Sequence, residues 1–196
     1  GRARRLGGRA KPLVRRRDGR TLLEALVASL APFTRRWLLC APPSVAAGLR
    51  VAEPVAAALL LAGDDGRGPG RAVQRAIERS RSDRVLRTVA DWARPHPDLW
   101  SALLEGLGDA DAAVVETDGR RQVGAVVARR SALPLDPTSS LQGLLRGLNV
   151  HVISERGLST SARAALFDVD HPEDLWAVNP ELAPGAERPE DPIDAA

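Results

Sequence analysis

Short apolar runs alternate along this chain with longer segments in which hydrophobic residues repeat at helical spacing. Residues 85–90, 112–116 and 150–153 have the length and composition of buried strands, whereas residues 71–81 and 97–107 have helical patterns. Strands that alternate with helices predict an α/β fold with a mostly parallel sheet covered on both faces. Ligands of such sheets bind beyond the carboxyl ends of the strands, so residues that follow a strand are candidates for chemistry.

The first helix has clear boundaries in the sequence. Thr21 can cap its first turn, Glu24 completes a capping-box signature, and Pro32 ends it. Asp118 and Gly119 form a hairpin signal. We further expect strands at 36–41, 49–52 and 122–128, and helices at 55–62 (on propensity alone), 140–148 and 172–178.

The composition indicates a globular, cytoplasmic protein. Hydrophobic residues make up 44% of the 196-residue chain, which is enough for one domain with a core. Cys40 is the only cysteine and cannot form an internal disulfide, which fits a reducing compartment. The longest apolar run, 55–62, is far shorter than the roughly 20 residues that span a membrane. We expect one domain over residues 1–180, followed by an acidic, proline-rich, disordered tail at 181–196.

Basic residues are concentrated at the start of the chain. Residues 1–20 are rich in arginine and contain one acidic residue, Asp18, whereas the tail is acidic. The basic segment suggests an anionic partner, and the phosphates of a nucleotide or of a nucleic acid would both satisfy it. Lys11 is the only lysine in the chain. Either a compact ammonium charge is needed there or the lysine is a chance retention, and the two explanations weigh equally at this point.

Three groups of residues could carry chemistry. In GRARRLGGRAKPLV, residues 1–14, glycines would let backbone N–H groups approach a phosphate, although a solvated basic arm fits the spacing slightly better. Asp91 follows an expected strand and could either bind Mg²⁺ or cap a helix. Asp168 and Asp170 share one side of an extended segment and could hold a metal-bound phosphate or an acceptor, unless Asp170 caps the helix at 172–178. The sequence contains neither a Cys/His cluster nor a nucleophile elbow.

Together these segments resemble the molybdenum cofactor guanylyltransferase (MobA-like) family. The family's nucleotide-binding signature runs Leu-Ala-Gly-Gly-x-x-x-Arg-Met/Leu-Gly-Gly-x-Asp-Lys, and its metal-binding strand ends in Asp-x-Pro, whose Asp is matched by Asp91. The family's Asn/Asp-x-Asn/Asp-Thr-Pro-Glu-Asp-Leu is matched by residues 168–175, and this similarity is the most specific in the chain. The resemblance covers residues 1–178 with gaps. The residues that match the first signature are Gly1, Arg5, Gly7, Gly8 and Lys11.

The resemblance implies a Rossmann-like, three-layer α/β/α nucleotidyltransferase domain. It would transfer GMP from GTP to molybdopterin or the molybdenum cofactor, release pyrophosphate, and have other molybdenum cofactor maturation proteins as partners, without nucleic acid or a membrane. Lys11 and Asp91 would be catalytic, and Asp91 and Asp170 would hold Mg²⁺. The acceptor side would comprise Asp168, Asp170 and Gln122. The nucleotide site would comprise Gly1, Arg5, Gly7, Gly8, Lys11, Glu53 and Asp91.

This sequence departs from the family pattern at several positions. Ala10, Ala93 and Val123 replace the family's Asp and two prolines. Arg87 and Thr88 lie in a strand that should be buried. The family's first strand is missing from this sequence, so we expect the glycine-rich segment to be mobile and GTP binding to be weak. Two alternatives therefore remain: a cytidylyltransferase of the same superfamily, or a degenerate, non-catalytic paralogue that binds a partner in cofactor maturation.

Overall fold

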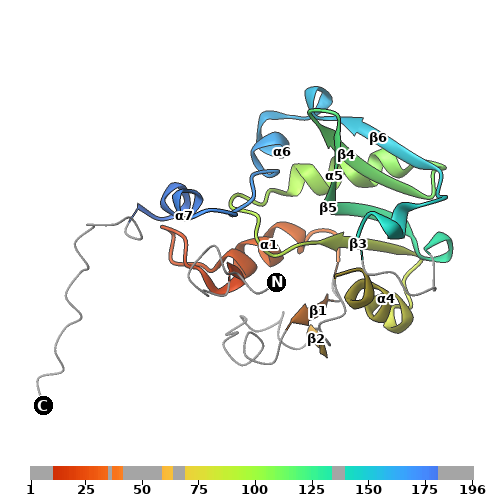
Figure 1. The fold of residues 1–196 in the computed structure, drawn as a ribbon, viewed down its shortest axis with the longest axis horizontal. Helices are drawn as coiled ribbons and strands as arrows, with labels where there is room; N and C mark the ends of the chain where they lie inside the picture. Colours follow the sequence, from red (N-terminus) through yellow and green to blue (C-terminus); the bar gives the residue numbers. More distant parts are fainter. Residues whose placement is uncertain (1–10, 35–36, 42–58, 64–68, 134–139, 181–196) are drawn as a thin grey trace, which may run out of the picture.

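The computed structural model describes residues 11–34, 37–41, 59–63, 69–133 and 140–180 (Figure 1). The main sheet has the strand order β3-β5-β4-β6. Its strands are β3 (Arg84–Thr88), β4 (Ala112–Thr117), β5 (Arg120–Arg129) and β6 (Val150–Ser154). A separate parallel pair consists of β1 (Trp37–Ala41) and β2 (Leu59–Gly63), which lie beside helix α4 (Pro69–Arg79).

The main sheet is mixed because β4 and β5 form a hairpin. Asp118 and Gly119 have φ values of 49° and 71°, as a tight two-residue hairpin turn requires. β5 therefore runs antiparallel to β4 and to β3, whereas β6 is parallel to β4. The strands β3, β4 and β6 share one direction, as expected for a mostly parallel sheet, and the hairpin strand β5 adds two antiparallel pairings.

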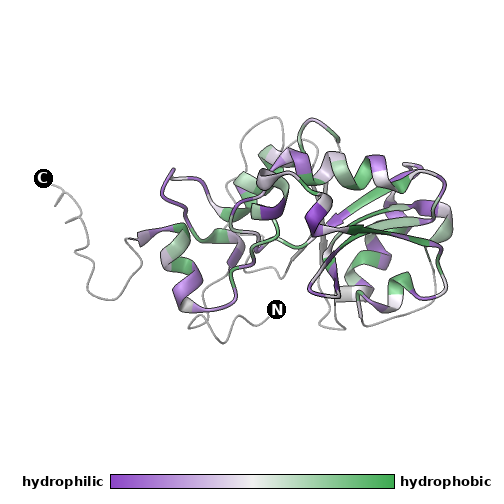
Figure 2. Cartoon of the chain, turned by 90° about the horizontal axis from the view of Figure 1, so that it is seen from above, coloured by the Kyte–Doolittle hydropathy of each residue, from purple (hydrophilic) through white to green (hydrophobic). Residues whose placement is uncertain are grey.

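Helices cover both faces of the main sheet: α4 on one, and α1 (Leu22–Leu30), α5 (Pro97–Leu107) and α6 (Thr160–Ala164) on the other. Along β4, Ala113 and Val115 are buried against α1, α5 and α6. Ala112 and Val114 alternate with them and are buried on the α4 face. Figure 2 shows mostly hydrophobic strands between helices that carry both polar and apolar residues. The expected three-layer α/β/α architecture is therefore confirmed.

A third apolar cluster joins the two ends of the described chain. Val14 and Leu22 pack with Ala93, Val169 and Leu175, and all five are buried. Leu175 belongs to the last helix, α7, which spans residues 172–178 and lies near the start of α1 in Figure 1. The cluster brings the segment that follows β3 beside both the N-terminal and the C-terminal segments.

Two of the helix predictions are wrong. Residues 59–63 form strand β2 rather than the end of a helix at 55–62, because pairing with β1 overrides the weak helix propensity of leucine and alanine. Residues 140–148 contain only a short 3₁₀ turn. Gly147 has a φ of 79°, which is incompatible with a continuing right-handed helix.

The expected strand at 49–52 and the tail at 181–196 lie outside the described residues. The other expected helices and strands are present in the part of the chain that the structure describes. Among these helices, none is long and apolar enough to cross a membrane.

Candidate active site beyond the carboxyl end of β3

Lys11 lies at the centre of a cluster of carboxylates. Its Nζ donates a hydrogen bond to Oδ1 of Asp170 at 2.7 Å and another to Oδ2 of Asp91 at 3.3 Å. The side chains of Lys11 and Asp91 are 19% and 27% exposed, so this contact is partly shielded from water. Three residues that the sequence placed in separate groups therefore meet at one point.

Backbone pairing holds the acidic residues together. Trp92 and Asp168 form an isolated antiparallel bridge. On either side of it, the Val169 N–H donates to the Asp91 carbonyl and the Ala93 N–H donates to the Phe167 carbonyl, both at 2.9 Å. This short ladder places Asp168 and Asp170 directly beyond the carboxyl end of β3, where ligands of α/β sheets bind.

Helix capping does not account for the acidic residues that contact Lys11. The N-cap of α5 is His96, whose Nδ1 accepts a hydrogen bond from the Asp98 N–H. At α7, the carboxylate of Asp174 accepts hydrogen bonds from the backbone N–H groups of Asp170 and His171. The carboxylates of Asp91 and Asp170 are directed to Lys11 instead.

The cluster carries more negative than positive charge. Burial, reinforced by the neighbouring charges of Asp91 and Asp170, raises the pKa of Asp168 to about 7. Burial alone would lower the pKa of Lys11, but the hydrogen bond to Asp170 and the charge of Asp91 outweigh it and raise that pKa. Oδ1 of Asp91 and Oδ1 of Asp168 are buried and have no hydrogen-bond partner. The charge and hydrogen-bonding capacity of these two oxygens are therefore not satisfied by the described residues.

A metal at this site would have few protein ligands. Within the described residues, no group of three or more His, Cys, Asp or Glu side chains is close enough to hold one ion together. Mg²⁺ commonly takes one or two carboxylates and completes its shell with water and phosphate oxygens. The unpartnered oxygen of Asp91 therefore fits Mg²⁺ that arrives with a nucleotide, and does not fit a dedicated protein cage.

The remaining predicted site residues lie elsewhere. Gln122 is on β5, two residues from Gly124, whose carbonyl accepts a hydrogen bond from the Val89 N–H just after β3. Gln122 is therefore at the same edge of the sheet as the cluster. The structure does not describe Gly1, Arg5, Gly7, Gly8 and Glu53.

The sequence of the chain matches a known family over three quarters of its length. The MobA-like NTP transferase domain family matches residues 1–150. The chain belongs to this family. No curated protein matches it significantly in sequence.

Solved structures share the MobA-like fold. One is molybdopterin-guanine dinucleotide biosynthesis protein A from Archaeoglobus fulgidus, with a TM-score of 0.65, 20% identity, and 91% and 92% of this chain and that chain covered. Another is 2-C-methyl-D-erythritol 4-phosphate cytidylyltransferase from Thermus thermophilus, with a TM-score of 0.61, 21% identity, and coverage of 86% and 91%. HddC from Yersinia pseudotuberculosis complexed with GMP-PN has a TM-score of 0.66, 15% identity, and coverage of 88% and 90%.

The sequence analysis did not predict the side-chain contacts that support the Lys11 cluster. Trp92 is 2% exposed, and its Nε1 donates to Oγ1 of Thr88 at 2.8 Å. Thr88, which looked out of place in a buried strand, thereby holds the residue next to Asp91. Arg87, the residue before Thr88, has no such partner. Both terminal nitrogens of its guanidinium are buried and lack a hydrogen-bond partner. A polar residue four positions before a buried tryptophan was the available signal for the Thr88 contact.

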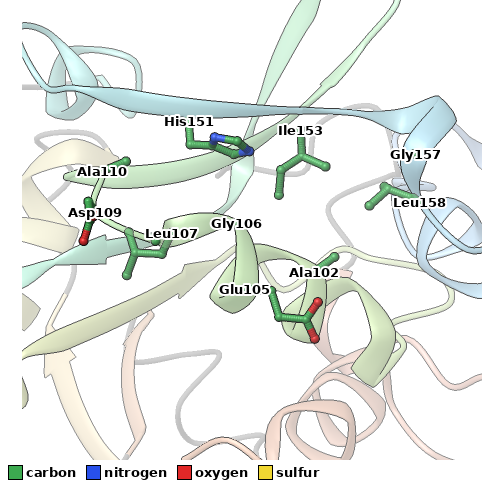
Figure 3. A pocket seen from close by; sticks show the side chains of 11 residues that line it. Ala102, Glu105, Gly106, Leu107, Asp109, Ala110, His151, Ile153, Gly157 and Leu158 are labelled. Carbon is green, nitrogen blue, oxygen red and sulfur yellow. The ribbon is translucent and has the colours of Figure 1, made fainter.

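A surface depression lies away from the cluster. It has a volume of about 490 Å³ and is lined by α5 and the edge strand β6. Figure 3 shows His151 and Ile153 of β6 above Gly106 of α5, where a Cβ would meet Cδ1 of Ile153 at 2.6 Å. No residue of the Lys11 cluster lines this depression. We therefore place the candidate chemistry at the cluster, where opposite charges and unpartnered carboxylate oxygens converge.

Proposed function

We propose that this protein is a nucleotidyltransferase that transfers GMP from GTP to molybdopterin or the molybdenum cofactor and releases pyrophosphate. The observation that carries the proposal is the convergence of Lys11, Asp91, Asp168 and Asp170 beyond β3. An ammonium group beside the Asp91 carboxylate, one oxygen of which has no hydrogen-bond partner, can position a metal-bound polyphosphate. Similarity to the MobA-like proteins supports the choice of GTP and the acceptor.

The reaction asks the protein mainly to position groups and neutralise charge. A phosphate oxygen of the acceptor attacks the α-phosphorus of GTP in line, the bond to the bridging oxygen breaks, and pyrophosphate leaves. Lys11 would bind the phosphates. Asp91, with Asp170, would hold Mg²⁺, which when bound supplies positive charge to the phosphate oxygens. Asp168 and Gln122 would face the acceptor.

Cytidylyl transfer is the second candidate. The fold is similar to a cytidylyltransferase, with a TM-score of 0.61, and to the molybdopterin-guanine dinucleotide protein, with a TM-score of 0.65. The two activities are separated by incubating the protein with Mg²⁺, molybdopterin and either α-labelled GTP or α-labelled CTP, and measuring label in the dinucleotide product. Preferential GMP incorporation is expected. CMP incorporation would favour the second candidate, and nucleotide binding without transfer would favour a non-catalytic paralogue.

Asp91→Asn should abolish transfer and leave the fold intact. Loss of a metal-binding carboxylate removes several kcal/mol of transition-state stabilisation, so we expect transfer to fall at least about 100-fold. Pyrophosphate release measures this loss, and thermal unfolding checks the fold. Asp109→Asn changes an exposed carboxylate away from the cluster and should keep full activity. Full activity of Asp91→Asn would remove Asp91 from the mechanism.

A further inference from the structure

Lys11 occupies the carboxylates that the proposed function assigns to a metal. Its ammonium lies 2.7 Å from Oδ1 of Asp170 and 3.3 Å from Oδ2 of Asp91. A Mg²⁺ ion binds an oxygen at about 2.0–2.1 Å and fills a full octahedral shell. The ammonium and a metal ion therefore cannot occupy the same side of these two carboxylates together.

We propose that Lys11 is a tethered cation that holds the metal position in the nucleotide-free protein, and that Mg²⁺ and Lys11 exchange on Asp91 and Asp170. This inference rests on the proposed function, because it takes these carboxylates as the metal site. Without a cation, the carboxylates of Asp91 and Asp170, which both contact Lys11, would repel each other as like charges, and the ammonium relieves that repulsion. Displaced by Mg²⁺, the same ammonium becomes available to the phosphates of the nucleotide.

The structure provides unsatisfied oxygens for the ion and a flexible tether for the ammonium. Oδ1 of Asp91 and Oδ1 of Asp168 are buried without a hydrogen-bond partner, so a metal ion that replaced Lys11 would find carboxylate oxygens that no other group engages. Lys11 begins the short 3₁₀ turn Lys11–Leu13, and its four-carbon stem lets the ammonium move without unfolding that turn. The exchange therefore needs a side-chain rotation and no change of fold.

The single lysine allows the exchange to be measured directly. We would acetylate the intact protein briefly with an N-hydroxysuccinimide ester, with and without Mg²⁺ and without nucleotide. Trypsin then yields the peptide of residues 10–15, whose only side-chain amine is that of Lys11 and in which acetylation can be quantified by mass spectrometry. A hydrogen bond between charged groups changes the fraction of free ammonium about tenfold or more. Because Mg²⁺ would release Lys11 from these bonds, we expect it to speed Lys11 acetylation about tenfold. If Lys11 is acetylated at the same rate in Mg²⁺ as in KCl of the same ionic strength, the proposed exchange is wrong.

Mn²⁺ binding to the nucleotide-free protein provides a second measurement, read by electron paramagnetic resonance. Lys11→Met should tighten Mn²⁺ binding about tenfold on the same reasoning, whereas Lys11→Arg, which keeps the charge, should not. Arg20→Met removes one positive charge that pairs with Asp18, outside the cluster. Equal tightening in Arg20→Met and Lys11→Met would indicate general electrostatics and contradict the exchange. Neither measurement uses GTP, so an absence of guanylyl transfer would count against the proposed function alone.

Discussion

Arg87 carries a buried charge without compensation. Both terminal nitrogens of its guanidinium are shielded from solvent and have no hydrogen-bond partner. Burial lowers the pKa of Arg87 to about 10, so the group is still charged at neutral pH. A buried charge that lacks a partner destabilises the folded state.

Arg87→Met should therefore stabilise the protein. Methionine keeps the length of the side chain and removes the buried charge, so we expect the free energy of unfolding to rise by about 1–3 kcal/mol. The folded pKa lies below the unfolded one, so the penalty is fully present below about pH 10 and is relieved above it. Denaturant unfolding at pH 7.5 measures the gain. Arg84→Met, at an exposed position of the same strand, should change stability little. A less stable Arg87→Met would show that the guanidinium has a compensating partner.

At the scale of elements, the site depends on a close approach between β5 and the segment after β3. A Cβ at Gly124 would lie 3.0 Å from Cγ2 of Val89 and 3.1 Å from Cζ2 of Trp92. Trp92 is buried, is bonded to Thr88, and pairs through its backbone with Asp168. It has little freedom to move away, so Gly124 is required here by contact rather than by its backbone angles.

Gly124→Ala should destabilise the protein and disturb the cluster together. Overpacking of a buried contact costs about 1–3 kcal/mol, and displacement of Trp92 would shift Asp91 and Asp168. Thermal unfolding and Mn²⁺ binding measure the two effects. Gly157→Ala is the matched control, because a Cβ there meets nothing within 4 Å, and its effect should stay within about 0.5 kcal/mol. If Gly124→Ala is destabilised but binds Mn²⁺ as the wild type does, the packing at Gly124 does not control the geometry of the cluster.

Element boundaries were predictable where local chemistry sets them. α5 spans Pro97–Leu107 as expected, because His96 caps its start, proline occupies the first turn, and Gly108 with a φ of 39° ends it. The helix at α1 likewise has reciprocal bonds between Thr21 and Glu24. The helix expected at 55–62 had no cap or periodic face behind it. Its described part is a strand because β1 pairs with it.

At the scale of the whole molecule, folding buries an acid in a negatively charged site. Asp168 is joined to Trp92 through the backbone ladder, and the next residue, Val169, belongs to the cluster that joins both ends of the described chain. Its pKa rises to about 7 on folding, mainly through burial. The folded protein therefore holds a proton that the unfolded chain has already released at pH 5 to 6.

The stability of the wild type should fall between about pH 4 and pH 7 through this group. A folded pKa above the unfolded value means that the native state binds more protons in that window, so stability declines as pH rises and is constant above it. After allowance for the exposed part of the side chain, we expect the free energy of unfolding to fall by about 1–2 kcal/mol over this range. Asp168→Asn should lose this dependence of stability on pH. Urea unfolding of the wild type and the variant at pH 5 and pH 8 measures the difference. A wild type and variant that differ equally at both pH values would contradict the raised pKa.

The sequence alone determined which segments are helices and strands wherever caps, turns and period were clear, and it determined the family through three short motifs. These features depend on residues within a few positions of one another, so they can be read without the fold. Only the tertiary structure decided that Lys11 contacts Asp91 and Asp170, which are 80 and 159 residues away along the chain. Only the tertiary structure decided that Thr88 supports Trp92 while Arg87 lies unpaired. Desolvation and long-range contacts depend on what packs against a side chain, and neighbouring residues in the sequence do not carry that information.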